Sequence, residues 1–157
     1  MKTILASAIA IGLATAPLAY ASGTLDDVRL AVQSGSDFGL THFQNIEFDD
    51  DQEEDNDFIE IEGWLDNNWY VELDMARDGT VTREDRRKRD SGPKGLTADE
   101  TLSYVQASAE EGMTQFDEID VDDSGRIEVE GDDNNGRELE IDFRTGNLQP
   151  VKVERDD

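Results

Sequence analysis

The chain has 157 residues, no cysteine, and 39 Asp and Glu against 14 Lys and Arg, which gives a formal net charge of −25 at pH 7. This acidity argues against binding to nucleic acid or to anionic membrane surfaces, because both attract basic proteins. Without cysteine the fold must be held by packing alone. Solubility in a salty medium is the simplest explanation of the charge.

The first 21 residues have the pattern of a secretory signal peptide. Lys2 precedes an apolar run from Ile4 to Leu18, and Ala19 and Ala21 form a small-x-small cleavage site. A membrane anchor is the alternative, but the run is shorter than the roughly 20 residues that a spanning helix needs. We therefore expect cleavage after Ala21, a periplasmic or secreted mature protein, and no membrane insertion after cleavage.

The first part of the mature chain predicts one helix followed by four strands. Thr24 is a suitable N-cap, and Gly39 can end the helix in a left-handed conformation. Apolar and acidic residues then alternate around Ile46, over 58–63 and over 69–75, as in strands with one buried face. Seven acids in the nine residues 49–57 predict a solvated loop. A fourth strand is expected to begin near Val81.

The second part repeats this order. Residues 85–96 are expected to be a linker, and they carry the basic run Arg86, Arg87, Lys88 and Arg89. Thr97 and Glu100 fit a capping box at the start of a second helix. The last strand, over 148–154, contains Pro150 and should lie on a sheet edge, because proline cannot donate a ladder hydrogen bond.

The two parts match residue by residue. The offset is 73 as far as the acidic loop, pairing Ile46 with Ile119, and 68 beyond it, pairing Gly63 with Gly131. We therefore predict an α+β fold of two tandem repeats, each a helix packed on an antiparallel sheet of about four strands. The expected domains are 1–21 signal peptide, 22–84 first repeat, 85–96 linker and 97–155 second repeat. The repeats should dock through a shared apolar face, because each is too small to bury enough surface alone.

The second repeat resembles the PepSY domain, and the first repeat keeps the same pattern with a longer acidic loop and Asn67-Asn68 at the hairpin, so the chain resembles a tandem PepSY protein. The resemblance is carried by 119–123, 127–129, Asn135-Gly136, 139–142, Gly146 and 151–154. It implies a small α+β module of exported bacterial proteins, including propeptides of thermolysin-type proteases. Such modules are thought to bind or restrain peptidases or other envelope proteins. The family has no agreed active site, so the resemblance assigns no residue roles.

One stretch resembles a calcium loop. Asp120, Asp122, Ser124 and Glu128 match several EF-hand ligand positions, but the last position is Gly131 and no helix signal follows. We interpret this stretch, and a second near-match over 74–85, as turns. Weak calcium binding by clustered carboxylates stays open, and no other cofactor is expected.

Catalytic candidates are few, whereas binding candidates cluster in the first repeat. His42 is the single histidine, which excludes zinc sites that need several His or Cys ligands. A partner site is expected at the aromatic residues that have no counterpart in the second repeat and at the basic run, because aromatic and Arg side chains dominate interfaces. These residues are Trp64, Trp69, Tyr70, Arg86, Arg87, Lys88 and Arg89. Packing of the aromatic residues in a local core, and pairing of the basic run with acidic sheet faces, are the alternatives.

The sequence thus predicts an exported, non-catalytic PepSY-type binding module. Its expected partner is a protein, either a peptidase or another envelope protein. The alternative function is that of a low-affinity calcium-binding or halotolerance protein whose acidic loops are themselves functional. An enzyme is the third interpretation.

Overall fold

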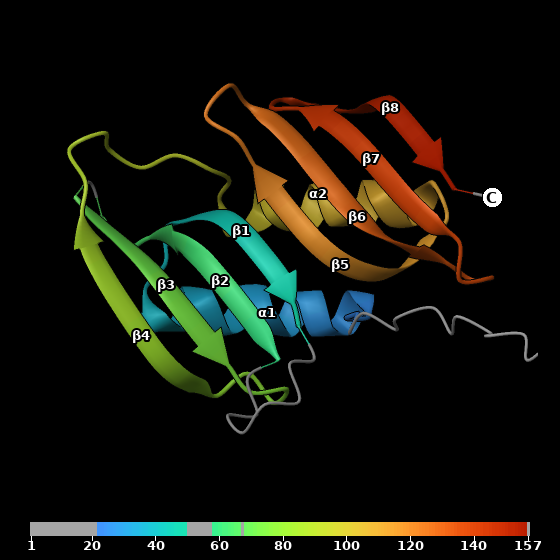
Figure 1. Cartoon of the computed structure of the whole chain (residues 1–157). Helices are drawn as coiled ribbons and strands as arrows, with labels where there is room; N and C mark the ends of the chain where they lie inside the picture. The colour runs from blue at the N-terminus through green and yellow to red at the C-terminus, as the bar shows by residue number, and fades with distance from the viewer. Residues whose placement is uncertain (1–21, 50–57, 67, 157) are drawn as a thin grey trace, which may run out of the picture.

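The computed structural model describes residues 22–49, 58–66 and 68–156. The predicted signal peptide and most of the acidic loop lie outside these ranges. Within these ranges, two helices and eight strands follow one another (Figure 1). In order they are α1 (Leu25–Phe38), β1 (His42–Phe48), β2 (Ile59–Trp64), β3 (Trp69–Met75), β4 (Val81–Lys88), α2 (Ala98–Glu110), β5 (Met113–Val121), β6 (Arg126–Asp133), β7 (Glu138–Arg144) and β8 (Asn147–Arg155).

Both helices begin at the predicted threonines. Thr24 forms a capping box with Asp27 at the start of α1, and Thr97 forms one with Glu100 at the start of α2. Each box satisfies backbone N–H groups that the first helical turn leaves without a partner. Gly39 follows α1 with a φ of 119°, a left-handed conformation that ends the helix as predicted.

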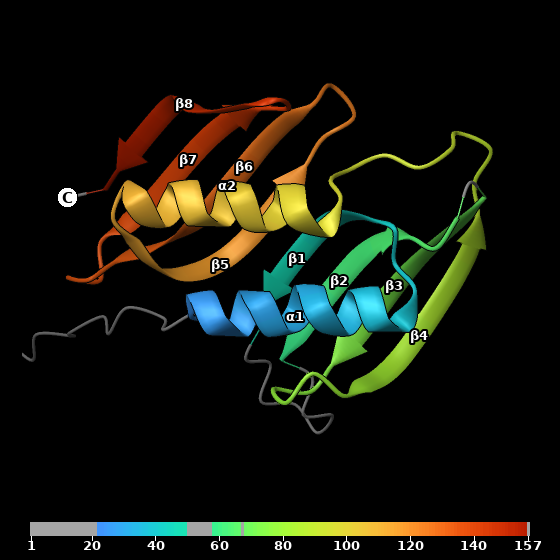
Figure 2. The ribbon, with the colours of Figure 1, turned by 180° about the vertical axis from the view of Figure 1, so that it is seen from behind.

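All eight strands form one antiparallel sheet, so the prediction of two separate helix-on-sheet repeats is wrong. The strand order is β4-β3-β2-β1-β5-β6-β7-β8, and β1 pairs with β5 at the centre. Two separate sheets would expose four edges, and joining them satisfies the backbone groups of two edges. Both helices lie side by side on one face of the sheet, and no described helix or strand covers the other face, which we call the open face (Figures 1 and 2).

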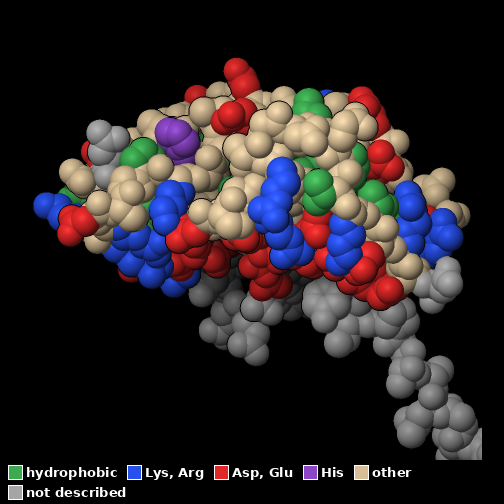
Figure 3. Space-filling view, turned by 90° about the horizontal axis from the view of Figure 1, so that it is seen from above, with side chains coloured by type: hydrophobic (Ala, Val, Ile, Leu, Met, Phe, Trp, Pro, Cys, Tyr) green, Lys and Arg blue, Asp and Glu red, His purple; other side chains and the backbone are tan. Residues whose placement is uncertain are grey.

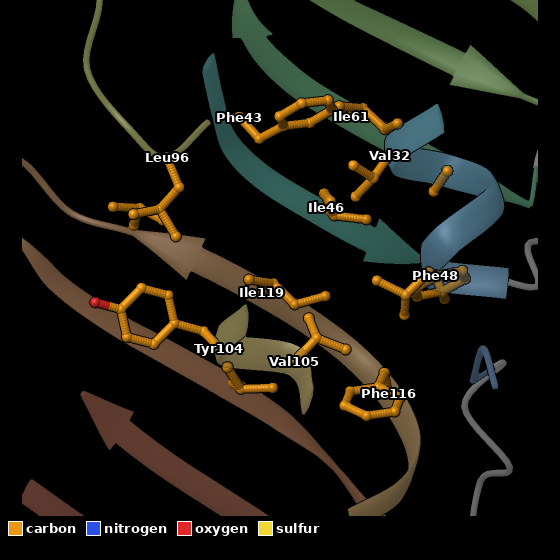
Figure 4. Packing of buried hydrophobic residues seen from close by; sticks show 14 of the residues in the cluster. Val32, Phe43, Ile46, Phe48, Ile61, Leu96, Tyr104, Val105, Phe116 and Ile119 are labelled. Atoms are coloured by element: carbon orange, nitrogen blue, oxygen red, sulfur yellow. The ribbon is translucent and has the colours of Figure 1, made fainter. Parts of the chain in front are cut away.

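One hydrophobic core lies between the sheet and the helices. It combines residues of both halves of the chain, including Phe43 and Ile46 from β1 and Phe116 and Ile119 from β5 (Figure 4). The expected shared apolar face is therefore present. The central ladder pairs Ile46 with Ile119, two residues that are equivalent at the sequence offset of 73.

Part of the predicted linker is strand. β4 pairs with β3 from Val81 to Lys88, so the first four residues of the range 85–96 belong to the sheet. The basic run therefore lies mainly on an edge strand. After it, Leu96 forms an isolated bridge with Phe43, which attaches the end of the connection to β1.

The two edges of the sheet differ in chemistry. Apart from Val81, the residues of β4 are polar or charged, and they are exposed. On β8, by contrast, Leu148 and Val151 are 48% and 58% exposed, and Pro150 lies between them. The edge position of the proline-containing strand is as predicted.

Candidate functional site

The open face of the sheet carries two rows of acidic side chains, because directly opposite residues of neighbouring strands share a face. We call these rows together the carboxylate face. From β4 to β8, the first row is Arg83, Asp74, Glu60, Glu47, Glu118, Glu130, Glu140 and Glu154. The second is Asp85, Glu72, Glu62, Asn45, Asp120, Glu128, Asp142 and Lys152. Seen from above, Asp and Glu gather along the lower side of the molecule, which faces the viewer in Figure 1 (Figure 3).

Burial and, to a lesser extent, neighbouring carboxylates raise the pKa of several carboxyl groups on this face. Burial, together with neighbouring carboxylates, raises the pKa of Glu60 to about 7 and that of Glu130 to about 7. Burial raises the pKa of Asp120 as well. Each of these groups is therefore harder to ionise in the folded protein than in the unfolded chain.

Cations lie toward both sides of the carboxylate face. Arg83 reaches over Asp74 and Glu72 from β4. Arg126 binds Asp142 at 2.9 Å on the other side, and it also pairs with Glu128. These basic side chains compensate the two most buried carboxylates of the face, Asp74 and Asp142, which are each 6% exposed.

The carboxyl groups around these cations form two equivalent triads. They are Glu60, Glu72 and Asp74, and Glu128, Glu140 and Asp142, which match at the offset of 68; within each triad the carboxyl oxygens lie within 4.8 Å of one another. Such groups can hold a hard cation. In this structure a guanidinium already binds at least two carboxylates of each triad.

The stretch that resembles an EF-hand loop forms the turn between β5 and β6. Asp122 accepts hydrogen bonds from the Ser124 and Arg126 backbone N–H groups, so it shapes this turn. Asp120 and Glu128 lie opposite one another on the sheet. The interpretation as a turn is confirmed, as it is for the second near-match, where the Ala76 N–H bonds to the Thr80 carbonyl oxygen. Calcium binding itself stays a prediction.

The basic run forms, with two aromatic residues, a surface that we call the basic edge. The Lys88 ammonium lies 5.0 Å from the centre of the Trp69 ring, and the Arg89 guanidinium lies 3.6 Å from the centre of the Tyr70 ring. Stacking of this kind holds a cation in place without neutralising it. Arg87 instead pairs with Glu72 at 2.5 Å, and Arg86 pairs with Glu84.

The predicted aromatic residues divide between the surface and the interior. Trp69 is half-buried, but Trp64 and Tyr70 are each 1% exposed and pack edge to face with ring centroids 5.4 Å apart. The Tyr70 hydroxyl donates to Glu62. Trp64 is therefore not accessible to a partner, and the local-core alternative describes Trp64 and Tyr70 better.

His42 lies at the start of β1, where its Nδ1 is 3.1 Å from the Thr41 hydroxyl oxygen.

Residue patterns alone missed the carboxylate rows. The alternation showed that acids share one face of each strand, but the rows depend on the pairing registers, which no local pattern specifies.

These features describe a two-layer α+β scaffold with one charged sheet face that no described helix covers. Residues 94–154 match the family model of PepSY_2, the peptidase propeptide and YPEB domain. The chain therefore contains a PepSY_2 domain, which includes α2 and β5 to β7 and most of β8. No curated protein and no solved structure matches the chain significantly. Within the described ranges, neither helix is long and apolar enough to cross a membrane.

Proposed function

We propose that this protein is an exported bacterial binding module of the PepSY type, without catalytic activity, which binds a peptidase or another envelope protein. The match of residues 94–154 carries this proposal, because PepSY domains are propeptide or regulatory modules. The corresponding sequence pattern in residues 22–84 supports a tandem PepSY relationship between the two parts of the chain. The signal-peptide pattern of residues 1–21 supports export.

We place the partner contact at the basic edge. At one end of the sheet Lys88 lies over the Trp69 ring and Arg89 lies over the Tyr70 ring, and aromatic and Arg side chains form the strongest contacts in protein interfaces. β4 is also an edge strand, to which a partner strand can add backbone hydrogen bonds. The second half of the molecule then serves mainly as support for this edge.

The test is binding of mature protein, from Ser22 onward, to a panel of purified secreted thermolysin-type peptidases, measured by surface plasmon resonance together with peptidase inhibition. Trp69→Ala and Lys88→Glu should each weaken binding at least about tenfold, the effect expected for an interface hot spot. Their melting temperatures should stay close to that of the wild type. Glu138→Ala, an exposed change on β7, is the matched control and should bind normally.

Two results would contradict the proposal at different levels. If no peptidase in the panel binds, the peptidase assignment fails. If a peptidase binds and the two edge variants bind as tightly as the wild type, the assignment stands and its placement on the basic edge fails.

A further inference from the structure

The outer side of β8 has no partner strand within the described part of the chain. β8 is the last strand of the sheet, and among the described residues it pairs only with β7 (Figure 1). Leu148 and Val151 on this strand are the large hydrophobic side chains that the described structure leaves exposed. A groove of about 470 Å³ continues this apolar surface between α2 and the start of β8, where Leu102 and Ala107 line it together with Leu148. Such an edge is a template for another strand, because its outward N–H and C=O groups are free to pair.

The register of β8 on β7 shows which backbone groups point away from the sheet. The Asp156 N–H donates to the Glu138 carbonyl oxygen at 3.2 Å, so these two opposite residues form a pair of the hydrogen-bonded type. Hydrogen-bonded and non-hydrogen-bonded pairs alternate along an antiparallel ladder. The backbone groups of Lys152 and Glu154 therefore face β7. The residues whose backbone groups point outward are Val151, Val153 and Arg155.

The side chains of the same stretch divide between the two faces of the sheet. Lys152 and Glu154 lie on the carboxylate face, where the Lys152 ammonium nitrogen is 2.9 Å from a Glu154 carboxyl oxygen. Val151, Val153 and Arg155 alternate with them and lie on the helix side. Val153 packs against the core, and Arg155 donates to the Glu111 carbonyl oxygen just after α2. The edge thus presents one cation and one anion on one face, two positions apart.

We propose that β8 is a self-association edge, to which a second copy of this chain adds its own β8 in antiparallel orientation, with Val153 opposite Val153. In this register Val151 of each copy lies opposite Arg155 of the other, so the outward backbone groups of both strands exchange hydrogen bonds. Lys152 of each copy lies opposite Glu154 of the other. This surface is separate from the partner site proposed on the basic edge, because β4 and β8 are the two opposite ends of the sheet.

The order of charges about Val153 explains why the occupant is a second copy and why this register is preferred. Pairing centred on Lys152 would place Lys152 opposite Lys152, and pairing centred on Glu154 would place Glu154 opposite Glu154. Like charges directly opposite one another destabilise strand pairing, whereas opposite charges stabilise it. Only the arrangement centred on Val153 places each Lys152 opposite a Glu154, so the edge is complementary to itself.

The overall acidity of the chain opposes this contact and makes it depend on salt. The full sequence has a formal net charge of −25, so two copies repel each other at long range. The Debye length falls from about 10 Å at 0.1 M ionic strength to about 3 Å at 1 M. Added sodium chloride should therefore raise the dimer fraction, because it screens the repulsion and leaves the backbone hydrogen bonds and the apolar contact of Val151 in place.

Sedimentation of the mature protein, from Ser22 onward, over a series of protein concentrations tests the association. The wild type should shift from monomer to dimer with rising concentration, and more so with added sodium chloride. A protein that stays monomeric up to about 1 mM, the limit of a weak contact, would overturn the proposal. Dimerisation that weakens with added salt would overturn it as well.

Charge reversal tests the register, in about 0.15 M sodium chloride, where the Debye length is about 8 Å. Lys152→Glu and Glu154→Lys should each lose at least about tenfold in self-affinity, because each places like charges opposite one another. An equimolar mixture of the two variants should associate again, since opposite charges then meet at both positions. Arg29→Glu, the same change of charge on α1, is the matched control and should self-associate as the wild type does. Thermal melts show that each variant is folded. Single variants that associate like the wild type, or a mixture that does not associate, would refute the register.

Amide hydrogen exchange of the wild type at low and high protein concentration locates the contact. The amides of Val151, Val153 and Arg155 should gain protection on association, whereas those of Lys152 and Glu154 are already protected by β7. A gain on β4, or a gain on β8 that omits the outward amides, would show that the copies meet elsewhere and would overturn the proposal.

Discussion

Removal of the Tyr104 hydroxyl group should measure how firmly α2 is tied to the sheet. The hydroxyl accepts a hydrogen bond from the Gly146 N–H at 2.8 Å and donates one to the Arg144 carbonyl oxygen at 3.2 Å. Tyr104 is 3% exposed, and its ring lies 5.3 Å from that of Phe143 between centroids. Tyr104→Phe keeps this ring contact and removes only the two hydrogen bonds.

The expected loss follows from those two bonds. A typical hydrogen bond contributes about 0.5–1.5 kcal/mol net to stability. Gly146 and Arg144 are exposed, so water can partly replace the two hydrogen bonds. We therefore expect the free energy of unfolding to fall by about 1–2 kcal/mol in total. For a domain of this size that lowers the melting temperature by about 4–8 °C.

The assay is thermal and urea unfolding at neutral pH, with Tyr104→Ala as the comparison. The alanine variant also creates a cavity and should lose about 3–5 kcal/mol. The urea m-value should stay constant in the Phe variant, since the surface exposed on unfolding hardly changes. A Phe variant as stable as the wild type, or as unstable as the Ala variant, would show that the hydrogen bonds are not what the hydroxyl contributes.

Three further predictions concern the sheet and its charges. A Cβ added at Gly131 would lie 2.0 Å from the Gln115 carbonyl oxygen, so Gly131→Ala should destabilise by about 2–3 kcal/mol in urea unfolding, and an unchanged midpoint would contradict the tight strand approach. Burial and the nearby Asp132 and Glu138 raise the pKa of Asp117 to about 6. Asp117→Asn should therefore stabilise by about 1 kcal/mol at pH 7.5, with the gain shrinking below pH 6 and vanishing near pH 4; a pH-independent effect would refute this cause. If the acidic groups form a calcium site, millimolar calcium should raise the melting temperature above that in sodium chloride of equal ionic strength, and equal curves would reject the site.

Local structure could be predicted because its signals are local. Thr97 and Glu100 occupy the positions of a capping box, and the structure forms that box. Alternation marked the strands, and Pro150 marked the last of them as an edge. Each of these inferences depends on residues a few positions apart, whose interactions are the same in any fold that contains the element.

The joining of the halves could not be predicted in the same way. The pairing of Ile46 with Ile119 links residues 73 positions apart, and an apolar residue flanked by acids fits a central strand as well as an edge strand. The solvent exposure of a single side chain is hard to predict for the same reason, because it depends on residues that are distant in the sequence. Trp64 belongs by alternation to the open face with Glu60 and Glu62, yet it is 1% exposed, because its surroundings come from other strands.

The unequal edges of the sheet set a limit on how copies of this protein can associate through their strands. Charged side chains along β4 discourage another β4 or β8 from pairing there, whereas β8 exposes Leu148 and Val151. Two chains that met β8 to β8 would be related by a twofold axis and would leave only β4 edges outside. Growth by strand addition would then stop at two copies, so the asymmetry favours closed assembly over open filaments.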